Sequence, residues 1–170
     1  MMPMESDTSH GDKVDTGLVC LVMLARLHEL TADADQLAHQ FKADGKPFSK
    51  TEILLASKQL GLKARAVKTT AARLDRTPLP AMGTDNDGRF FIVLRTDGDQ
   101  ALIFSPLVTR AETVPLADLH TRWTGELILF TSRASLAGEL KKFGRRGVRE
   151  WSALLRRWVN GRVIEEAFEK

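Results

Sequence analysis

The sequence predicts an α+β fold in which helices come first along the chain and a mostly antiparallel sheet follows. Up to Gly61, apolar residues recur at helical spacing, behind residues that cap helices. After Gly61, short alternating segments are separated by turns rich in Asp and Gly, which is typical of strands joined as hairpins. A chain of 170 residues is long enough to bury one such core.

The first helix is expected over residues 16–30. Asp15 or Thr16 can cap it, because a short side-chain oxygen accepts the free N–H groups of a helix's first turn. Apolar residues occur on nearly every side of this segment. A helix of that kind is usually buried, so we expect it to be central.

Two more helices should follow. Residues 33–42 fit the second, with apolar side chains on one side. Ser49 and Glu52 have the spacing of a capping box, which predicts the start of the third. Gly61 is placed to end it, because glycine is common just past a helix C-terminus.

The remaining segments alternate between strand and turn patterns. Residues 62–67 alternate apolar and polar, as in a half-buried strand, and 69–76 fit a short helix or turn. The turn sequences TDNDGR and TDGDQ flank FFIVLR, and FFIVLR with ALIFS is predicted to form a β-hairpin. Further strands are expected at residues 79–82, 90–95, 101–105 and 125–132, with a helical turn at 115–123.

Charge divides the chain into three parts: a polar, flexible N-terminus over residues 1–13, one domain over 14–132, and a basic tail over 133–170. Residues 1–132 hold 15 Lys and Arg against 17 Asp and Glu, whereas the tail holds 10 against 5. The tail should be helical, with an amphipathic segment at 148–159. That segment either packs on the domain or lies on a membrane surface.

Several classes of protein are excluded by composition. A single cysteine rules out an internal disulfide and a cysteine-based zinc site, and fits a reducing compartment. No apolar stretch approaches the ~20 residues of a membrane span, and the N-terminus lacks the pattern of a signal peptide. Because the basic charge is confined to the tail, nucleic acid is not an expected partner.

Three stretches together resemble one family. These are DTGLVCLVML, LPAMGTDNDGRFFIVL and ALIFSP, in that order. They resemble the papain-like peptidase domains at the N-terminus of bacterial ABC exporters, over roughly residues 11–132. The resemblance implies a papain-like fold, with the N-terminal helices packed on the sheet. Full peptidases of this family cleave bacteriocin leader peptides after a double glycine.

The family's chemistry needs four groups. A cysteine thiolate at a helix N-terminus is the nucleophile, a histidine is the base, an aspartate orients the histidine, and a glutamine holds the oxyanion. At the matching positions this sequence has Thr16, Phe90, Ser105 and His10, respectively. The resemblance therefore implies a domain that is not an enzyme and needs no cofactor.

Other residues offer no evident replacement. Cys20 matches the family's second, non-catalytic cysteine, and apolar neighbours should make its thiol inert. His28 and His39 are expected on helix surfaces, and His120 in a polar turn. These spacings predict no metal site. The alternative is an active cysteine peptidase that uses Cys20.

The closest resemblance is to the degenerate peptidase-like domains of type I secretion exporters for RTX toxins and large adhesins. It implies a domain that binds the unfolded secreted protein at the cytoplasmic face of the bacterial inner membrane. Its other partners would be the exporter's membrane and ATPase domains. A second alternative is a membrane-peripheral adaptor that acts through the basic tail, with residues 148–159 on the lipid.

The expected docking surface is the former catalytic cleft. Its candidate residues are Thr16, Arg89, Phe90, Phe91 and Ser105, with His10 at the edge. Each also has a simpler interpretation. Thr16 caps a helix, one of the two phenylalanines belongs to the core because they alternate on a strand, and Ser105 is a turn residue.

Overall fold

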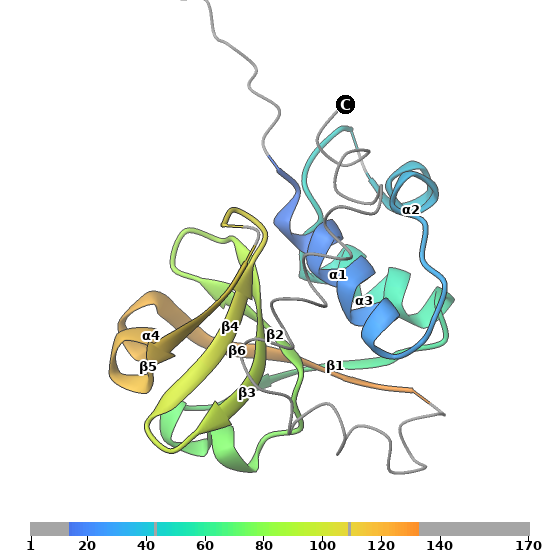
Figure 1. The fold of residues 1–170 in the computed structure, drawn as a ribbon. Helices are drawn as coiled ribbons and strands as arrows, with labels where there is room; N and C mark the ends of the chain where they lie inside the picture. Colours follow the sequence, from blue (N-terminus) through green and yellow to red (C-terminus); the bar gives the residue numbers. More distant parts are fainter. Residues whose placement is uncertain (1–13, 43, 109, 133–170) are drawn as a thin grey trace, which may run out of the picture.

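The computed structural model describes residues 14–42, 44–108 and 110–132 (Figure 1). Three helices lie beside a six-stranded sheet whose neighbouring strands are all antiparallel. The α+β architecture predicted from the sequence is therefore confirmed. The expectations for residues 1–13 and for the basic tail 133–170 concern segments outside the described residues.

The first helix, α1, spans Thr16–Leu27, and Asp15 is its N-cap. Every residue of α1 except Arg26 is buried. A helix without a polar side can be stable only in the centre of a domain, as the sequence predicted. It ends three residues earlier than expected, because Glu29 takes a left-handed conformation with φ of +59° and the Leu30 backbone N–H bonds back to Ala25.

Two shorter helices flank α1. Helix α2 spans Ala34–Phe41, and helix α3 spans Lys50–Gln59. The predicted capping box is present: the Ser49 backbone N–H donates to Glu52 Oε2 at 2.8 Å, and the two side chains also contact each other. Gly61 follows α3 with a φ of +84°, the left-handed conformation in which glycine is favoured.

The sheet has the strand order β1-β6-β2-β3-β4-β5. The predicted hairpin occurs as β3–β4, and β2 pairs with β3 in a second antiparallel hairpin. The strands are β1 (Lys63–Lys68), β2 (Ala81–Asp85), β3 (Phe90–Asp97), β4 (Gln100–Ser105), β5 (Arg110–Pro115) and β6 (Trp123–Thr131). Two further short helices lie within the described residues: the 3₁₀ helix η1 (Ala71–Arg76) and helix α4 (Leu116–Arg122).

Strand β5 was not predicted from the sequence. Its residues read RAETVP, which carries only two apolar side chains directed toward the interior, Ala111 and Val114. It pairs with β4 alone and forms one edge of the sheet. An edge strand of this composition is held in place by backbone pairing, and apolar periodicity does not reveal that pairing.

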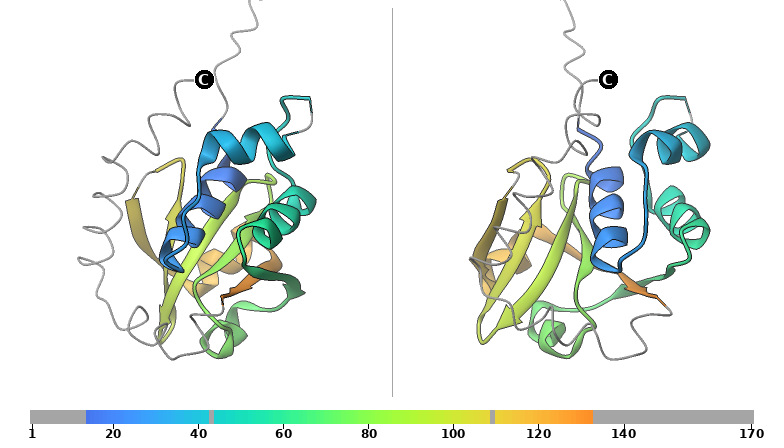
Figure 2. Two further views of the ribbon diagram at one scale, coloured as in Figure 1. Left: turned by 90° about the vertical axis from the view of Figure 1, so that its right-hand side faces the viewer. Right: turned by 45° about the vertical axis from the view of Figure 1, so that its right-hand side comes forward.

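The two faces of the sheet pack against different elements (Figure 2). Phe90, Ile92 and Leu94 of β3 join the core formed with α1, α2 and α3. Phe91 and Val93 join a second core with η1 and α4. The alternation of side chains along one strand thus places neighbouring residues in different cores.

His28 is buried, with 4% of its surface exposed, so the expectation of a surface histidine is wrong. Among the described residues neither of its ring nitrogens has a hydrogen-bond partner. His28 is the C-cap of α1, and the chain turns back there, with the Leu30 backbone N–H bonding Ala25. Burial lowers the pKa of His28, because the charged form is poorly solvated there.

His28 should make folding less stable in acid. Below a pH of about 6.5 the unfolded chain takes up a proton that folded His28 resists, so the free energy of unfolding falls as pH decreases toward the lowered pKa. The slope is at most about 1.4 kcal/mol per pH unit.

Urea unfolding at pH 7.5 and 5.5 should show this loss of stability in the wild type and a smaller loss in His28→Leu. His39→Leu, on the exposed side of α2, is the control and should keep the wild-type slope. Equal losses of unfolding free energy in the wild type and His28→Leu would show that buried His28 is not the cause of the pH dependence.

Candidate functional site

Asp15 organises the N-terminus of α1. Its Oδ1 accepts the Leu18 backbone N–H at 3.1 Å, which caps the helix. Both carboxylate oxygens accept the Phe48 backbone N–H, at 3.2 and 3.1 Å, and Lys42 Nζ lies 3.7 Å from Oδ2. One buried carboxylate therefore joins the start of α1 to the segments that end α2 and precede α3.

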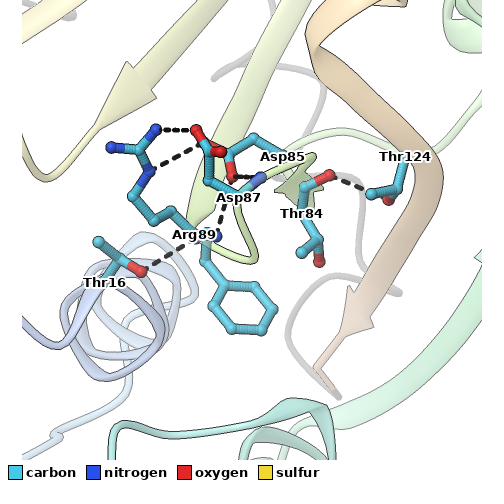
Figure 3. Close-up of polar contacts among 7 residues, drawn as sticks. Thr16, Thr84, Asp85, Asp87, Arg89 and Thr124 are labelled. Carbon is cyan, nitrogen blue, oxygen red and sulfur yellow. Dashed lines mark hydrogen bonds and ion pairs between the residues drawn. The ribbon is translucent and has the colours of Figure 1, made fainter.

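Thr16 follows as the first residue of α1 and is buried. Its Oγ1 accepts a hydrogen bond from the Phe90 backbone N–H at 3.0 Å, which ties the helix N-terminus to the start of β3 (Figure 3). The Phe90 ring packs beside Gly17, where a Cβ would lie 3.1 Å from Phe90 Cδ2. The first turn of α1 and the Phe90 ring are thus in close contact, with no room for a side chain at Gly17.

Arg89 precedes Phe90 in the β2–β3 turn. Its Nε lies 3.3 Å from Asp85 Oδ2, and its guanidinium also pairs with Asp87 (Figure 3). Asp85 Oδ1 accepts the backbone N–H groups of Asp87 and Arg89, each at 2.9 Å. The turn is therefore stabilised from within, and the Arg89 charge is partly neutralised by two carboxylates.

Phe91 and Ser105 lie on the other face of the sheet. Both line an open pocket of about 330 Å³ whose wall also includes Arg89. Among the described residues, Ser105 makes no hydrogen bond with Thr16 or with Phe90. The candidates therefore form two groups, Thr16 with Phe90 on the α1 face and Arg89 with Phe91 and Ser105 on the pocket face. His10 lies outside the described residues.

Cys20 is fully buried one turn inside α1. Burial, reinforced by the nearby negative charge of Asp15, raises the pKa of its thiol well above the usual range. A thiol in this environment is protonated at neutral pH and is a poor nucleophile. Its position agrees with the structural role expected from the sequence.

Within the described ranges, no imidazole or carboxylate hydrogen-bonds the Thr16 hydroxyl, and three potential metal ligands do not converge anywhere. No described helix has both the length and the apolar character that crossing a bilayer requires. The hydroxyl accepts a backbone N–H, and in the described part of the chain no side chain bonds to it as an activating base would. This arrangement can hold the helix against the sheet, and it can present backbone and apolar groups to a ligand.

Sequence reasoning missed two features of the site. Asp15 was considered only as a helix cap, and its bonds to Phe48, 33 residues away, have no local signal. The exposed pair Leu107 and Val108 at the pocket rim was not selected either. The signal in the sequence is that these two apolar residues follow a predicted strand and a proline, where a turn would expose them.

Comparison with known proteins identifies the family to which the chain is similar. Residues 7–135 match the model of the peptidase C39 family. Over 131 residues the chain is 37% identical to the leukotoxin translocation ATP-binding protein LktB of Mannheimia haemolytica. Over the same length it is 39% identical to the cyclolysin secretion/processing ATP-binding protein CyaB of Bordetella pertussis. Each alignment covers 76% of this chain and 18% of the relative, so the chain spans less than a fifth of either relative's length.

Solved structures show the same fold. The N-terminal peptidase C39 like domain of the toxin secretion ATP-binding protein from Vibrio parahaemolyticus superposes with a TM-score of 0.64 at 18% identity, over 70% of this chain and 98% of that one. A double glycine motif protease from an AMS/PCAT transporter, solved with its leader peptide, gives 0.63 at 18% identity, over 76% and 88%. Helices packed on an antiparallel sheet are thus the architecture of C39-like domains of ABC transporters.

Proposed function

The chain belongs to the peptidase C39 family, and on that premise we propose that its domain binds an unfolded secreted polypeptide without cleaving it. The domain would act as part of a type I secretion ABC exporter, at the cytoplasmic face of the bacterial inner membrane. Its cargo would be an RTX toxin or a large adhesin. Its partners within the exporter would be the membrane and ATPase domains.

The hydrogen bond between Thr16 and Phe90 is the observation that carries this proposal. By the sequence resemblance, Thr16 matches the family's nucleophile, and its hydroxyl accepts the Phe90 backbone N–H at 3.0 Å. By the same resemblance Phe90 matches the base, and its side chain is part of the core. A site that uses these two residues for packing keeps the junction of helix and sheet, and neither residue can accept a proton as the base of an acyl transfer does, which supports binding without cleavage.

Cys20 does not restore the chemistry. Its side chain has no exposed surface, and burial raises its pKa, so neither a thiolate nor access for a peptide is provided. Cleavage through this cysteine would need α1 to leave the core. Binding needs no such change, because a polypeptide can dock on the surface of the domain while α1 stays in the core.

Kinship with toxin exporters supports the identity of the cargo. LktB and CyaB are named for the translocation of leukotoxin and the secretion of cyclolysin, and this chain is similar to part of each. An unfolded chain pays an ordering entropy on binding, so we expect weak and reversible affinity. Weak binding suits a domain that must release its cargo to a transport channel.

Two measurements on the 170-residue chain test the proposal. A repeat fragment of an RTX toxin, unfolded without calcium and folded with it, is titrated into the isotope-labelled chain. The unfolded fragment should shift NMR signals around Thr16 and Phe90, and the folded fragment should not. Separately, a double-glycine leader peptide should remain intact, and Cys20 should react with a thiol reagent only when urea unfolds the chain. Leader cleavage that Cys20→Ala abolishes would establish the peptidase alternative, and absence of shifts with the unfolded fragment would refute cargo binding.

A further inference from the structure

The pocket on the sheet face opposite α1 has an apolar base. Phe91, Ile103 and Leu119 line it from β3, β4 and α4, with 7%, 5% and 2% of their surfaces exposed. The Phe91 ring lies close over Gly83, where a Cβ would be 2.5 Å from Phe91 Cζ. Because Gly83 of β2 has no side chain, the Phe91 ring can lie flat against the sheet and leave the volume of the pocket open.

The rim of the pocket is apolar as well. Leu107 and Val108, in the β4–β5 turn, are 49% and 42% exposed. In the described part of the chain the one other large apolar side chain with such exposure is Leu55, on α3. Single exposed apolar residues are ordinary, but two beside an apolar hollow form a continuous surface that water solvates poorly.

Charge at the pocket is balanced. Arg89 is paired with Asp85 and Asp87 in the turn that forms one wall. Glu112 and Arg122 also line the pocket, and in the described ranges neither makes an ion pair. A wall with carboxylates and guanidinium groups interspersed favours no strongly charged occupant, and it offers donors and acceptors to a neutral peptide backbone.

We propose that this pocket holds one large apolar side chain of an extended polypeptide, flanked by neutral residues. The inference rests on the proposed function, and it says which feature of the cargo the domain recognises: an apolar side chain on an extended segment. A pocket of about 330 Å³ is at the small end of ligand sites and admits a side chain rather than a folded surface. Folded proteins bury such side chains, so the pocket would select unfolded cargo.

The pocket is close in sequence to the contact between helix and sheet. Arg89 forms part of its wall, and the next residue, Phe90, donates its backbone N–H to Thr16. An extended chain seated here would therefore be sensed on both faces of β3. The signals of Phe91, Ile103 and Leu119 report the pocket itself, because these side chains belong to the core on the opposite face from Thr16 and Phe90.

The test uses the 170-residue chain and two synthetic peptides. One is a Gly/Ser 11-mer with a central Phe, and the other has Ala in its place. By NMR titration the Phe peptide should shift the signals of Phe91, Ile103 and Leu119, and the Ala peptide should bind at least about fivefold more weakly. Leu107→Ser with Val108→Ser, at exposed positions that folding does not need, should weaken the Phe peptide about tenfold. Leu55→Ser, equally exposed on α3, is the matched control and should have no effect.

The outcomes separate the two proposals. Shifts from an unfolded RTX fragment that spare the pocket and survive the rim substitutions would overturn this inference and leave the proposed function standing. No shifts from either peptide or fragment would overturn both. Shifts of the pocket signals on concentrating the chain alone would assign the surface to a second copy of the chain and would also overturn the inference.

Discussion

Replacing Asp15 with alanine is expected to lower the free energy of unfolding by about 2 to 4 kcal/mol. The loss has two sources. Removing the helix cap costs about 1 kcal/mol, and leaving the buried Phe48 N–H without its acceptor costs about 1 to 3 kcal/mol. The pair with Lys42 adds little, because that side chain is 32% exposed and the charges are 3.7 Å apart. Urea unfolding followed by tryptophan fluorescence measures the difference.

Asp33→Ala is the matched control for Asp15→Ala. Asp33 caps α2 through one exposed hydrogen bond, to the Gln36 backbone N–H at 2.8 Å, and has no second role in the described structure. Its loss should cost about 1 kcal/mol. If the two alanine variants were equally stable, Asp15 would be an ordinary cap, and the junction of the three helices would be held by their apolar contacts alone.

Asp15 also illustrates how far sequence could predict this site. The capping role follows from a short carboxylate before an apolar helix, and the structure confirms it. The bonds to Phe48 depend on where the chain returns after α2, and this return is fixed by tertiary packing. Local patterns thus identified the residue but not its second partner.

The helices and hairpins were predictable because their signals are local. Ser49 with Glu52, and the Asp- and Gly-rich turns, each specify a backbone conformation within a few residues. Strand β5 and the burial of His28 have no such signal. The first depends on pairing with β4, and the second depends on the turn that folds back over the end of α1.

The candidate residues were predicted to form one surface, but they lie in two groups on opposite faces of the sheet. Phe90 and Phe91 were expected to lie on different faces of the sheet, since the side chains of adjacent residues on a strand point in opposite directions. What the sequence did not give was the assignment of Ser105 and Arg89, which line the pocket with Phe91. Assigning them required the register of β3 against β4, in which Ile92 is opposite Phe104.

Phe90→Ala is expected to lower the free energy of unfolding by about 3 to 5 kcal/mol, the range for removing a large aromatic side chain from a core. The ring is 7% exposed and packs beside Gly17, so alanine would leave a cavity at the junction of α1 and β3. Phe90→Leu keeps most of the apolar volume and should lose much less. Phe41→Ala is the control, because that phenylalanine is half-buried at the end of α2 and should cost less than Phe90→Ala.

The Phe90 result decides between two roles for the position. If the ring is a packing element, stability falls as stated, and Phe90→Leu binds an unfolded RTX fragment as the wild type does. If the ring instead contacts cargo directly, Phe90→Ala would cost less than about 1 kcal/mol and would weaken binding severalfold. The burial of the ring and the backbone hydrogen bond to Thr16 favour the first result. If the domain binds cargo as proposed, contacts on this face would then come from groups other than the Phe90 side chain.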